Sequence, residues 1–382
     1  MAPATRGSWV LVAGDFRFTG GMDKANAHLA RGLARHGAAV HLVAHSVEAG
    51  LAREAGVRVT RVPRPLGASA LGERLLDRAG RAIARYEHAA GAVVVTNGGN
   101  CLWPGVSWIH CVHDAWPCSD AGAPRWFRAK NRLVKQWARR RERLATGRAR
   151  VVITNSDKTR GEVVELLRVP AERVTVVYLG CDEGAAPADP ATRARVRGEL
   201  GFDGAAPVLM FVGALGWDDN KGFDRVWAAW RDLAREGGWT SRLLVVGDGA
   251  GRARWAQEAA RAGCAGLVRF VGASDRVGDL LAAADLLVSP VRYEAYGLAV
   301  QEAIARGVPA VVSASAGVAE RYPPAARALL LDRPDAPECL PRAILRWSGA
   351  REHWREAFDA FGAALRRYTW TDMVDRIVAV AS

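Results

Sequence analysis

The most constraining feature of the sequence is a strand–helix–strand pattern that occurs twice, nearly two hundred residues apart. In the first copy, the apolar run SWVLVAG at 8–14 ends in glycine, and a polar loop, a helical pattern at 23–36 and the run AAVHLVAH follow. In the second copy, at 207–249, PVLMFVGALG precedes a helical pattern with Trp227 and Leu233 on one side, and LLVVGDG closes the unit. Such alternation builds a parallel sheet. Two separate starts predict two Rossmann-like α/β domains rather than one long sheet.

The rest of the chain is consistent with two cytoplasmic domains. The length of 382 residues suits this number at roughly 150 residues per domain. We expect the linker within 181–207, which lacks a strand pattern and is rich in Ala, Pro and Asp. Six scattered cysteines without a CxxC pair predict reduced thiols. Because no apolar run approaches a membrane span and the opening apolar stretch is too short for a signal peptide, we expect a cytoplasmic protein.

The formal net charge of +13 comes mainly from one segment. Residues 121–150 hold eleven basic side chains and a single acidic one, Glu142, and their pattern predicts a basic amphipathic helix at 124–150. One interpretation packs its apolar stripe on the core, and the other brings this face to an anionic membrane or a phosphate-bearing lipid acceptor. We expect no nucleic-acid partner, since no recognition motif accompanies the charge. The stripe consists of Trp126, Leu133, Trp137 and Leu144.

The loop after the first apolar run is glycine-rich but is not a dinucleotide fingerprint. It reads GDFRFTGGM, which lacks G-x-G-x-x-G and is longer than the tight turn of that motif. A nicotinamide enzyme is therefore disfavoured. Gly20 and Gly21 lie just before a helix, where the absence of side chains lets backbone amides approach an anion, although an ordinary loop explains the pair equally well.

A second anion site is predicted in the segment DLLVSPVRYEAYGLAVQEAIARGVPAVVS. An apolar strand runs into a loop that contains Glu294, and a helix opens near Gly297. Leu298 and Ala299 follow, so three unpaired amides and the helix dipole are available to a phosphate at the carboxyl end of a parallel strand. Glu294 and Glu302 flank this position. Because like charge repels a diphosphate, we expect these carboxylates to bind the hydroxyl groups of a sugar and a ribose.

The context SP..YEAYGLAVQEAIARGVP with its E-x7-E spacing resembles the signature of the family-4 retaining glycosyltransferases of the GT-B fold. Further segments resemble the family in order along the chain: the GG loop, VHDAWP, TNSDKTR, VVYLGCD, FVGALG...KGFD, VVGDG and the terminal YTWTDMVDRI. The resemblance implies an α/β protein with two Rossmann-like domains that face each other across a cleft. It places the acceptor domain at 1–183 and the donor domain at 184–365, with a helix at about 366–382 crossing back.

The resemblance also implies a reaction. A hexose-type sugar moves from a UDP- or GDP-sugar to a hydroxyl group of a glycan, glycolipid or small molecule, with retained configuration and without a metal or cofactor. Cell-envelope glycan synthesis is the expected setting, on the cytoplasmic side and with the inner membrane face as an open alternative. Two rival interpretations remain: another GT-B enzyme such as a sugar-nucleotide epimerase, and a basic membrane or nucleic-acid adaptor on a degenerate scaffold.

The donor-site residues are carried over from the family motifs. Glu294 is expected against the donor sugar hydroxyls, Glu302 against the ribose hydroxyls, and the amides of 297–299 against the diphosphate. Lys221 in NKGFD matches the family's phosphate-contacting lysine, and Gly213 and Tyr296 complete the expected donor site. One departure is Ala214, since many relatives have Arg at this position. The sequence suggests that Arg292 or a residue of the 19–24 loop, TGGMDK, replaces the missing cation.

The catalytic assignment in the first domain rests on WIHCVHDAWP. His113 resembles the family histidine near the sugar and acceptor, with His110 as a second candidate and Asp114 as a residue that orients it. Together with Cys111 and Cys118, the two histidines also mimic a metal site. We expect no metal there, because adjacent residues of a strand point to opposite faces, so His110 and Cys111 cannot converge without a bend.

Overall fold

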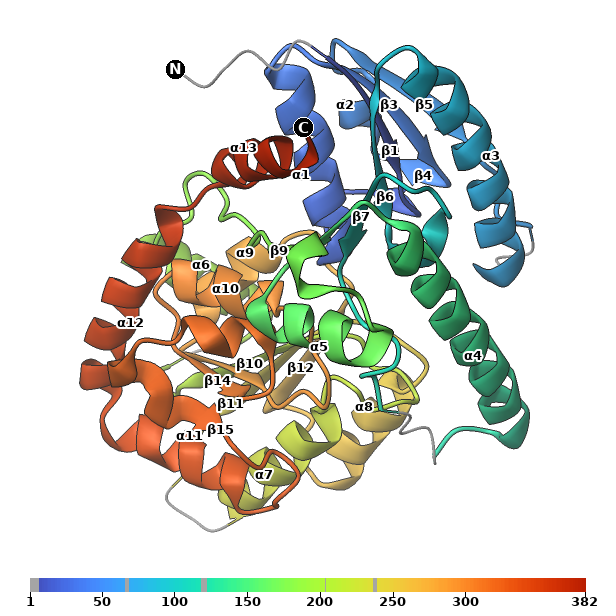
Figure 1. The fold of residues 1–382 in the computed structure, drawn as a ribbon. Coiled ribbons are helices and arrows are strands. Elements are labelled where there is room, and N and C mark those ends of the chain that lie inside the picture. Colours follow the sequence, from blue (N-terminus) through green and yellow to red (C-terminus); the bar gives the residue numbers. More distant parts are fainter. Residues whose placement is uncertain (1–6, 66–68, 118–121, 203, 236–238) are drawn as a thin grey trace. The chain divides into compact units, whose positions relative to one another are not determined.

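The computed structural model forms two compact units, each of which is described by itself (Figure 1). It describes residues 7–65, 69–117, 122–202, 204–235 and 239–382. The first unit comprises 1–115, 129–180 and 368–382, and the second comprises 116–128 and 181–367. The chain thus passes from the first unit to the second between Gly180 and Cys181, whereas the sequence analysis set this boundary after 183. Residues 116–128, which the sequence analysis assigned to the first domain, group with the second.

The first unit is built on a parallel sheet. In the described residues, seven strands pair in the order β5-β3-β1-β6-β7-β8-β9, and β2 and β4 form a separate short pair. Runs such as VVVTN and VVIT are rich in β-branched residues, which suit buried parallel strands. The strands are β1 (Ser8–Val12), β2 (Asp15–Phe16), β3 (Ala39–Ala44), β4 (Ser46–Val47), β5 (Val57–Arg61), β6 (Val93–Asn97), β7 (Val106–Ile109), β8 (Val151–Thr154) and β9 (Val174–Val176).

Helices connect these parallel strands, as crossover connections require. Ser156 caps α5 by accepting a hydrogen bond from the backbone N–H of Thr159. The helices are α1 (Met22–Arg35), α2 (Ala49–Ala52), α3 (Ser69–Ala89), α4 (Arg125–Arg148), α5 (Asp157–Leu167) and α13 (Trp370–Ala381), with short 3-10 turns at Gly98–Asn100 and Ala171–Arg173. The two helices expected at 23–36 and within 124–150 correspond to α1 and α4.

The second unit repeats the plan with a six-stranded parallel sheet, ordered β12-β11-β10-β13-β14-β15 among the described residues. The strands are β10 (Val208–Val212), β11 (Arg242–Val246), β12 (Val268–Gly272), β13 (Leu286–Ser289), β14 (Ala310–Ser313) and β15 (Leu330–Leu331). The helices are α6 (Pro190–Leu200), α7 (Phe223–Arg235), α8 (Arg252–Arg261), α9 (Val277–Leu280), α10 (Leu298–Ala305), α11 (Cys339–Gly349) and α12 (Arg351–Arg366). Short 3-10 turns lie at Leu281–Ala283, Gly317–Arg321 and Pro324–Leu329.

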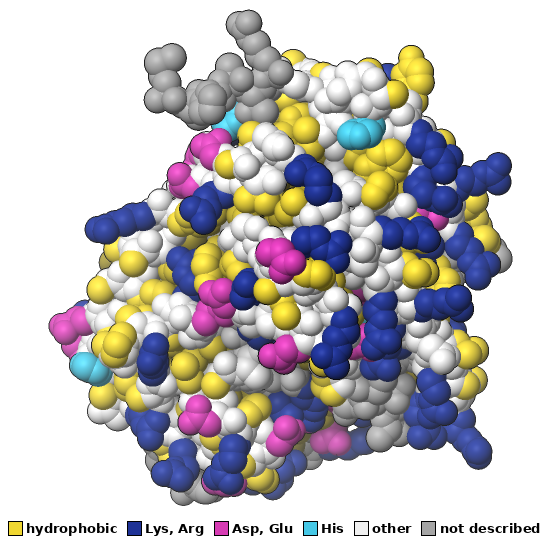
Figure 2. Space-filling model, in the orientation of Figure 1, with side chains coloured by type: hydrophobic (Ala, Val, Ile, Leu, Met, Phe, Trp, Pro, Cys, Tyr) yellow, Lys and Arg dark blue, Asp and Glu magenta, His cyan; other side chains and the backbone are white. Residues whose placement is uncertain are grey.

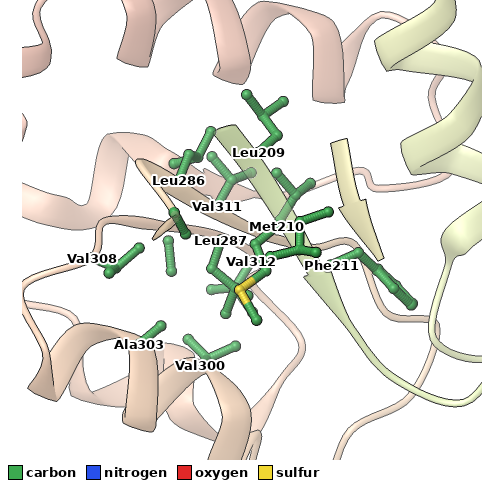
Figure 3. Packing of buried hydrophobic residues seen from close by; sticks show 14 of the residues in the cluster. Leu209, Met210, Phe211, Leu286, Leu287, Val300, Ala303, Val308, Val311 and Val312 are labelled. Atoms are coloured by element: carbon green, nitrogen blue, oxygen red, sulfur yellow. The ribbon is translucent and has the colours of Figure 1, made fainter. Parts of the chain in front are cut away.

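The central strands of the second unit, β10 and β13, consist largely of buried apolar residues. Leu209 pairs in register with Leu286, and Met210 with Leu287. Figure 3 shows these four residues within the apolar cluster that also contains Val300 of α10. Strands covered by helices on their faces need continuous apolar runs rather than alternating ones, which is the pattern read from the sequence.

In each sheet, the strand order reverses at one point. In the first unit the chain progresses from β1 to one side and later returns to β6 on the other, and in the second unit β10 and β13 stand in the same relation. Loops at the carboxyl ends of such neighbouring strands diverge and leave a crevice for ligands. The predicted donor residues follow β10 and β13, so the topology of the second unit places their loops at this switch point.

The C-terminal helix packs on the first unit, where α13 lies beside α1 (Figure 1). Thr369 begins it with a capping box that includes Asp372. The Trp370 ring stacks on His28 of α1 at 4.2 Å between centroids. A Cβ atom added at Gly32 of α1 would lie 2.6 Å from Val374, so glycine permits the close approach of the two helices.

The apolar stripe of α4 faces solvent, not the core. Trp126 and Leu133 are each 68% exposed and Leu144 is 40% exposed, whereas the buried residues of the helix include Glu142 and Ala145. The interpretation that packs this stripe on the core is therefore wrong. Lys and Arg side chains gather at the right of Figure 2, where Figure 1 places α4. Among the described residues, none of the helices combines the length and apolar character that crossing a membrane requires.

Candidate active site

Lys221 and Glu294, which are distant in sequence, meet in the second unit. The Lys221 Nζ atom lies 2.5 Å from a carboxylate oxygen of Glu294. Lys221 is in the loop after β10 and Glu294 in the loop after β13, so the two strands at the switch point deliver one residue each. Both side chains remain partly exposed, at 32% and 24%. A cation and a carboxylate are thus available to a ligand at this edge of the sheet.

The two loops are joined by hydrogen bonds from Asn220, which sequence reasoning did not single out. Its side-chain amide donates to the carbonyl of Tyr293 at 3.1 Å, and its own carbonyl accepts from the Arg292 N–H at 2.8 Å. Gly213 lies directly beneath Lys221, since an added Cβ would sit 3.0 Å from the lysine side chain. Gly213 therefore leaves room for the first carbons of the Lys221 side chain.

The predicted anion site at the start of α10 has the expected backbone geometry. Gly297 is the N-cap residue with φ +111°, a conformation that favours glycine, and it has no side chain to cap the helix. Val300 is the first residue after it whose amide bonds back, to the Gly297 carbonyl at 3.0 Å. Leu298 is buried and Ala299 is partly exposed. Glu302 lies within the same helix and is also partly exposed.

Tyr296, in the loop before α10, has a buried side chain. Its side chain is 2% exposed, and its hydroxyl donates to the Gln301 side chain while accepting from Arg321 at 3.3 Å. Burial raises the pKa of this phenol well above its usual value. The residue expected at the donor is therefore a packing residue whose hydroxyl is used within the protein, and it stabilises the conformation around Gly297.

Arg292 is held by a partner other than a phosphate. Two of its nitrogens bond to the two carboxylate oxygens of Asp224 at 2.8 and 2.6 Å, and it also donates to the Asp219 carbonyl. These contacts with Asp224 raise the pKa of the guanidinium. A bidentate pair of this kind is strong and directional, so the arrangement does not favour Arg292 as the cation that replaces the arginine missing at Ala214.

In the first unit, the GG loop forms the start of α1. Gly21 is the N-cap and carries no side chain, and Gly20 has φ +79°. Asp23 follows in the first turn. Burial, and to a smaller extent the charge of Asp15, raises the pKa of Asp23 to about 6. The glycines leave the helix end open, but a carboxylate beside it disfavours an anion at neutral pH.

His113 is placed by Glu142, a residue that the sequence analysis noted only as an isolated acid. The backbone N–H of His113 donates to one Glu142 oxygen at 2.9 Å, and its Nδ1 atom lies 2.9 Å from the other. The Glu142 side chain is 2% exposed, whereas the His113 ring is 33% exposed. The sequence did contain a signal for this pair: Glu142 is the single acidic residue in a helix rich in Lys and Arg.

The other candidates near β7 separate as strand geometry predicts. Burial lowers the pKa of His110 to about 3, and its ring packs against Trp108 at 4.3 Å between centroids. Cys111, His113 and Glu142 instead offer ligand atoms within 4.8 Å of one another. Cys118 lies outside the described residues. We propose no metal at this trio, because both carboxylate oxygens of Glu142 already contact His113.

Asp114 does not bond to the imidazole. Its carboxylate is paired with Arg143 at 2.9 Å and with Arg139 at 3.4 Å. In the structure, His113 is therefore oriented by Glu142 of α4 and not by Asp114, its neighbour in sequence.

Comparison with known proteins identifies related sequences. Residues 19–184 match the family model of Glycosyltransferase Family 4, and residues 206–348 match that of the Glycosyl transferases group 1. A 2-deoxystreptamine N-acetyl-D-glucosaminyltransferase of Streptomyces fradiae is 29% identical over 274 residues, covering 70% of this chain and 62% of the relative. An alpha-D-kanosaminyltransferase of Streptomyces kanamyceticus is 28% identical over 188 residues, covering 48% and 47%. The chain thus aligns with about half to three fifths of the length of these relatives.

Solved structures show the same fold over nearly the whole chain. WaaG, a glycosyltransferase involved in lipopolysaccharide biosynthesis, superimposes with a TM-score of 0.76 at 22% identity and covers 97% of this chain and 99% of its own. Sucrose-phosphate synthase from Thermosynechococcus elongatus gives a TM-score of 0.77 at 20% identity and covers 98% of both chains. With two Rossmann-like units and both family models matched in order, the chain belongs to the family-4, group-1 glycosyltransferases of the GT-B fold.

Proposed function

We propose that this protein transfers a hexose-type sugar from a UDP- or GDP-sugar to a hydroxyl group, with retention of the anomeric configuration. The observation that carries the proposal is the contact of Lys221 with Glu294 at the switch point of the second sheet, next to the open start of α10 at Gly297. A diphosphate needs a cation and amide donors, and a sugar needs a carboxylate that accepts from its hydroxyl groups. These groups are adjacent here.

The chemistry follows from how charge develops. When the glycosidic bond breaks, negative charge grows on the departing diphosphate, and a fixed ammonium with a helix N-terminus stabilises that charge most in the transition state. Lys221 would leave Glu294 for the diphosphate, and Glu294 would accept from the sugar hydroxyls. Glu302 would bind the ribose hydroxyls. In a front-face reaction the departing phosphate oxygen takes the proton of the acceptor hydroxyl as the new glycosidic bond forms, so no protein nucleophile is needed.

We propose that the transfer needs no bound metal or cofactor. The positive charge that a divalent ion would bring to the diphosphate can be supplied by Lys221 and by the amides of residues 297–299. Related structures support the donor class: an Anabaena protein of 19% identity, with a TM-score of 0.72, has been solved in complex with UDP-glucose. Curated relatives support more than one acceptor class, since they include an O-antigen chain mannosyltransferase of Escherichia coli as well as the 2-deoxystreptamine enzyme. A cell-envelope glycan or glycolipid is the acceptor that also gives α4 a role.

We propose that α4 brings the protein to an anionic membrane surface on the cytoplasmic side. The stripe of Trp126, Leu133 and Leu144 is exposed, and cations flank it on the helix surface, among them Lys130 and Arg140. An exposed apolar stripe between cations suits the boundary between headgroups and acyl chains. Each cation near such a surface contributes about 1 kcal/mol.

The membrane proposal is tested by reversing charge without disturbing the fold. Lys130→Glu with Arg140→Glu changes two exposed side chains, and binding to vesicles containing anionic lipid should fall at least about 30-fold. Arg235→Glu with Arg261→Glu is the matched control, since both residues are exposed in the second unit. Equal vesicle binding by the two double variants would contradict the membrane role.

The transferase proposal is tested by thermal unfolding with nucleoside diphosphates and their sugars. A ligand present at a hundred times its dissociation constant adds about 2.7 kcal/mol of stability. We expect a rise in Tm with UDP or GDP and their hexose conjugates, and loss of most of this rise in Lys221→Ala. If none of these compounds raises the Tm, the proposed donor class is wrong.

A further inference from the structure

Glu142 of α4 is a buried carboxylate beside the loop after β7, and His113 contacts both of its oxygens. One oxygen accepts the backbone N–H of His113 and the other lies against its ring Nδ1, each at 2.9 Å. The two bonds come from one residue, so Glu142 fixes both where the loop after β7 lies and how the imidazole is turned. A buried carboxylate without such partners would be costly.

The neighbouring side chains of α4 hold the same loop. Arg139 donates from Nε to the carbonyl of His113 at 3.1 Å and pairs with Asp114 at 3.4 Å. Arg143 pairs with Asp114 at 2.9 Å. Residues 139, 142 and 143 share one face of the helix by their spacing. The loop is therefore clamped by three side chains of α4, of which Glu142 is the one that bonds to the ring.

This contact determines the proton position on the ring. A carboxylate can only accept, so Nδ1 must carry the hydrogen. The remaining ring nitrogen, Nε2, lies on the other side of the imidazole from Glu142, in a side chain that is 33% exposed. His113 can therefore present Nε2 to a ligand while Nδ1 stays bonded to the protein.

We propose that Glu142 is a positioning residue that keeps His113 as a cationic hydrogen-bond donor, with Nε2–H available to an oxygen of a substrate bound at the first unit. The inference rests on the proposed transferase function for the identity of the ligand. In this role His113 stabilises negative charge on oxygen during transfer. It does not take the acceptor proton, which leaves with the phosphate oxygen.

The charges around the ring support a protonated state. Burial by itself lowers the pKa of His113, but contacts with Cys111 and Glu142 outweigh it and raise the pKa to about 11. The geometry favours Glu142 as the main partner, because its carboxylate oxygen lies 2.9 Å from Nδ1, whereas the Cys111 sulfur lies 4.0 Å away. The titratable and charged groups around His113 are Cys111, Asp114, Glu142, Arg139, Arg141 of α4 and Glu73 of α3.

The direct test needs no substrate. In wild-type protein with ¹⁵N-labelled histidine, the His113 ring should keep the shifts of an imidazolium from pH 6 to pH 9, assigned by its loss in His113→Gln. In Glu142→Gln, which keeps the shape but not the charge, the ring should titrate near its ordinary pKa of about 6.5. A wild-type His113 that titrates near pH 6.5 would overturn the proposal, even if the Glu142 variant failed to fold.

The activity test separates positioning from a purely structural role. Glu142→Gln should keep within about ten-fold of wild-type kcat at pH 5.5 and fall roughly 100-fold at pH 8.5, since about 1% of a group of pKa 6.5 is protonated there. Glu142→Asp should restore part of the rate at pH 8.5, and Glu165→Gln on the exposed face of α5 is the matched control. An equal loss at every pH would contradict the proposal.

Failure of this inference and failure of the proposed function are distinguishable. An imidazolium that persists to pH 9 in a protein that turns over no nucleotide-sugar supports the Glu142 contact and refutes only the transferase. Transfer activity together with an unprotonated His113 refutes only the role of Glu142. Zn²⁺ that binds stoichiometrically to wild-type protein at pH 7, but not to Cys111→Ser, would also overturn the proposal, because Nδ1 would then be a metal ligand.

Discussion

Replacement of Lys221 by alanine removes a side-chain cation that contacts Glu294 and that we place on the departing diphosphate. Two unit charges 4 Å apart interact by about 4 kcal/mol at an effective dielectric constant of 20. The rate depends only on the interaction of Lys221 with the charge that develops on the diphosphate as the bond breaks. We therefore expect Lys221→Ala to remove about 3 to 4 kcal/mol of transition-state stabilisation. That corresponds to a fall in kcat of roughly 100- to 1000-fold.

The stability of the Lys221 variant should change little. The ion pair is partly exposed on both sides, and such pairs contribute about 1 kcal/mol or less. Initial rates of nucleoside diphosphate release give kcat, and urea unfolding gives the free energy of unfolding. Arg231→Ala is the matched control, because its side chain is also 32% exposed and pairs with an acid on α7. A Lys221→Ala enzyme with kcat within three-fold of wild type would refute the reasoning.

Four further substitutions test the structure. Asp23→Asn should raise the free energy of unfolding at pH 8 by up to about 3 kcal/mol. The gain should build up between pH 4 and pH 6 and vanish below pH 4, because the unfolded carboxyl ionises near its ordinary pKa of 3.8 and the folded one only near 6; urea unfolding across pH measures this. Gly180→Val should lower the free energy of unfolding by about 2 to 4 kcal/mol, since a Cβ there would lie 2.4 Å from the Trp370 amide nitrogen. Gly198→Ala inside α6, with open space around it, should raise the free energy of unfolding by about 0.5 to 1 kcal/mol. Gly297→Ala forces a left-handed conformation on alanine, so calorimetry should show UDP or GDP binding at least ten-fold weaker.

The alternation of apolar runs and helical patterns was enough to predict two parallel-sheet units. It succeeded because buried parallel strands need continuous apolar residues and each must be followed by a helix. The linker was harder. Asp189 and Pro190 form a strong helix start, with Asp189 accepting from Thr192, but the surrounding Ala and Pro content suggested an irregular segment, so α6 was missed.

Contacts between distant segments set the limit for the site. The spacing of Glu294 and Glu302 is local and could be read directly. The pairing of Arg292 with Asp224 instead depends on how the loop after β13 packs against the start of α7. The same holds for Glu142. An isolated acid in a basic helix suggests that the acid has a specific partner. Only the packing of α4 on the loop after β7 shows that this partner is His113.

Burial likewise could not be read from composition. The stripe of α4 has the spacing of a core-facing stripe, and the exposed Trp126 and Leu133 show that the opposite face packs instead. Tyr296 lies within the signature segment and looked like a ligand contact, yet it is enclosed. Both cases depend on which neighbours the fold supplies.

The proposed sugar transfer is best tested by measuring the release of nucleoside diphosphate from UDP- and GDP-hexoses with a broad panel of hydroxyl acceptors, and by proton NMR of the product. We expect acceptor-dependent release by wild-type protein, an α-linked product from an α-linked donor, and loss of at least 99% of the rate in Lys221→Ala and Glu294→Ala. Turnover that is unchanged in both variants, or a product of inverted configuration, would contradict it.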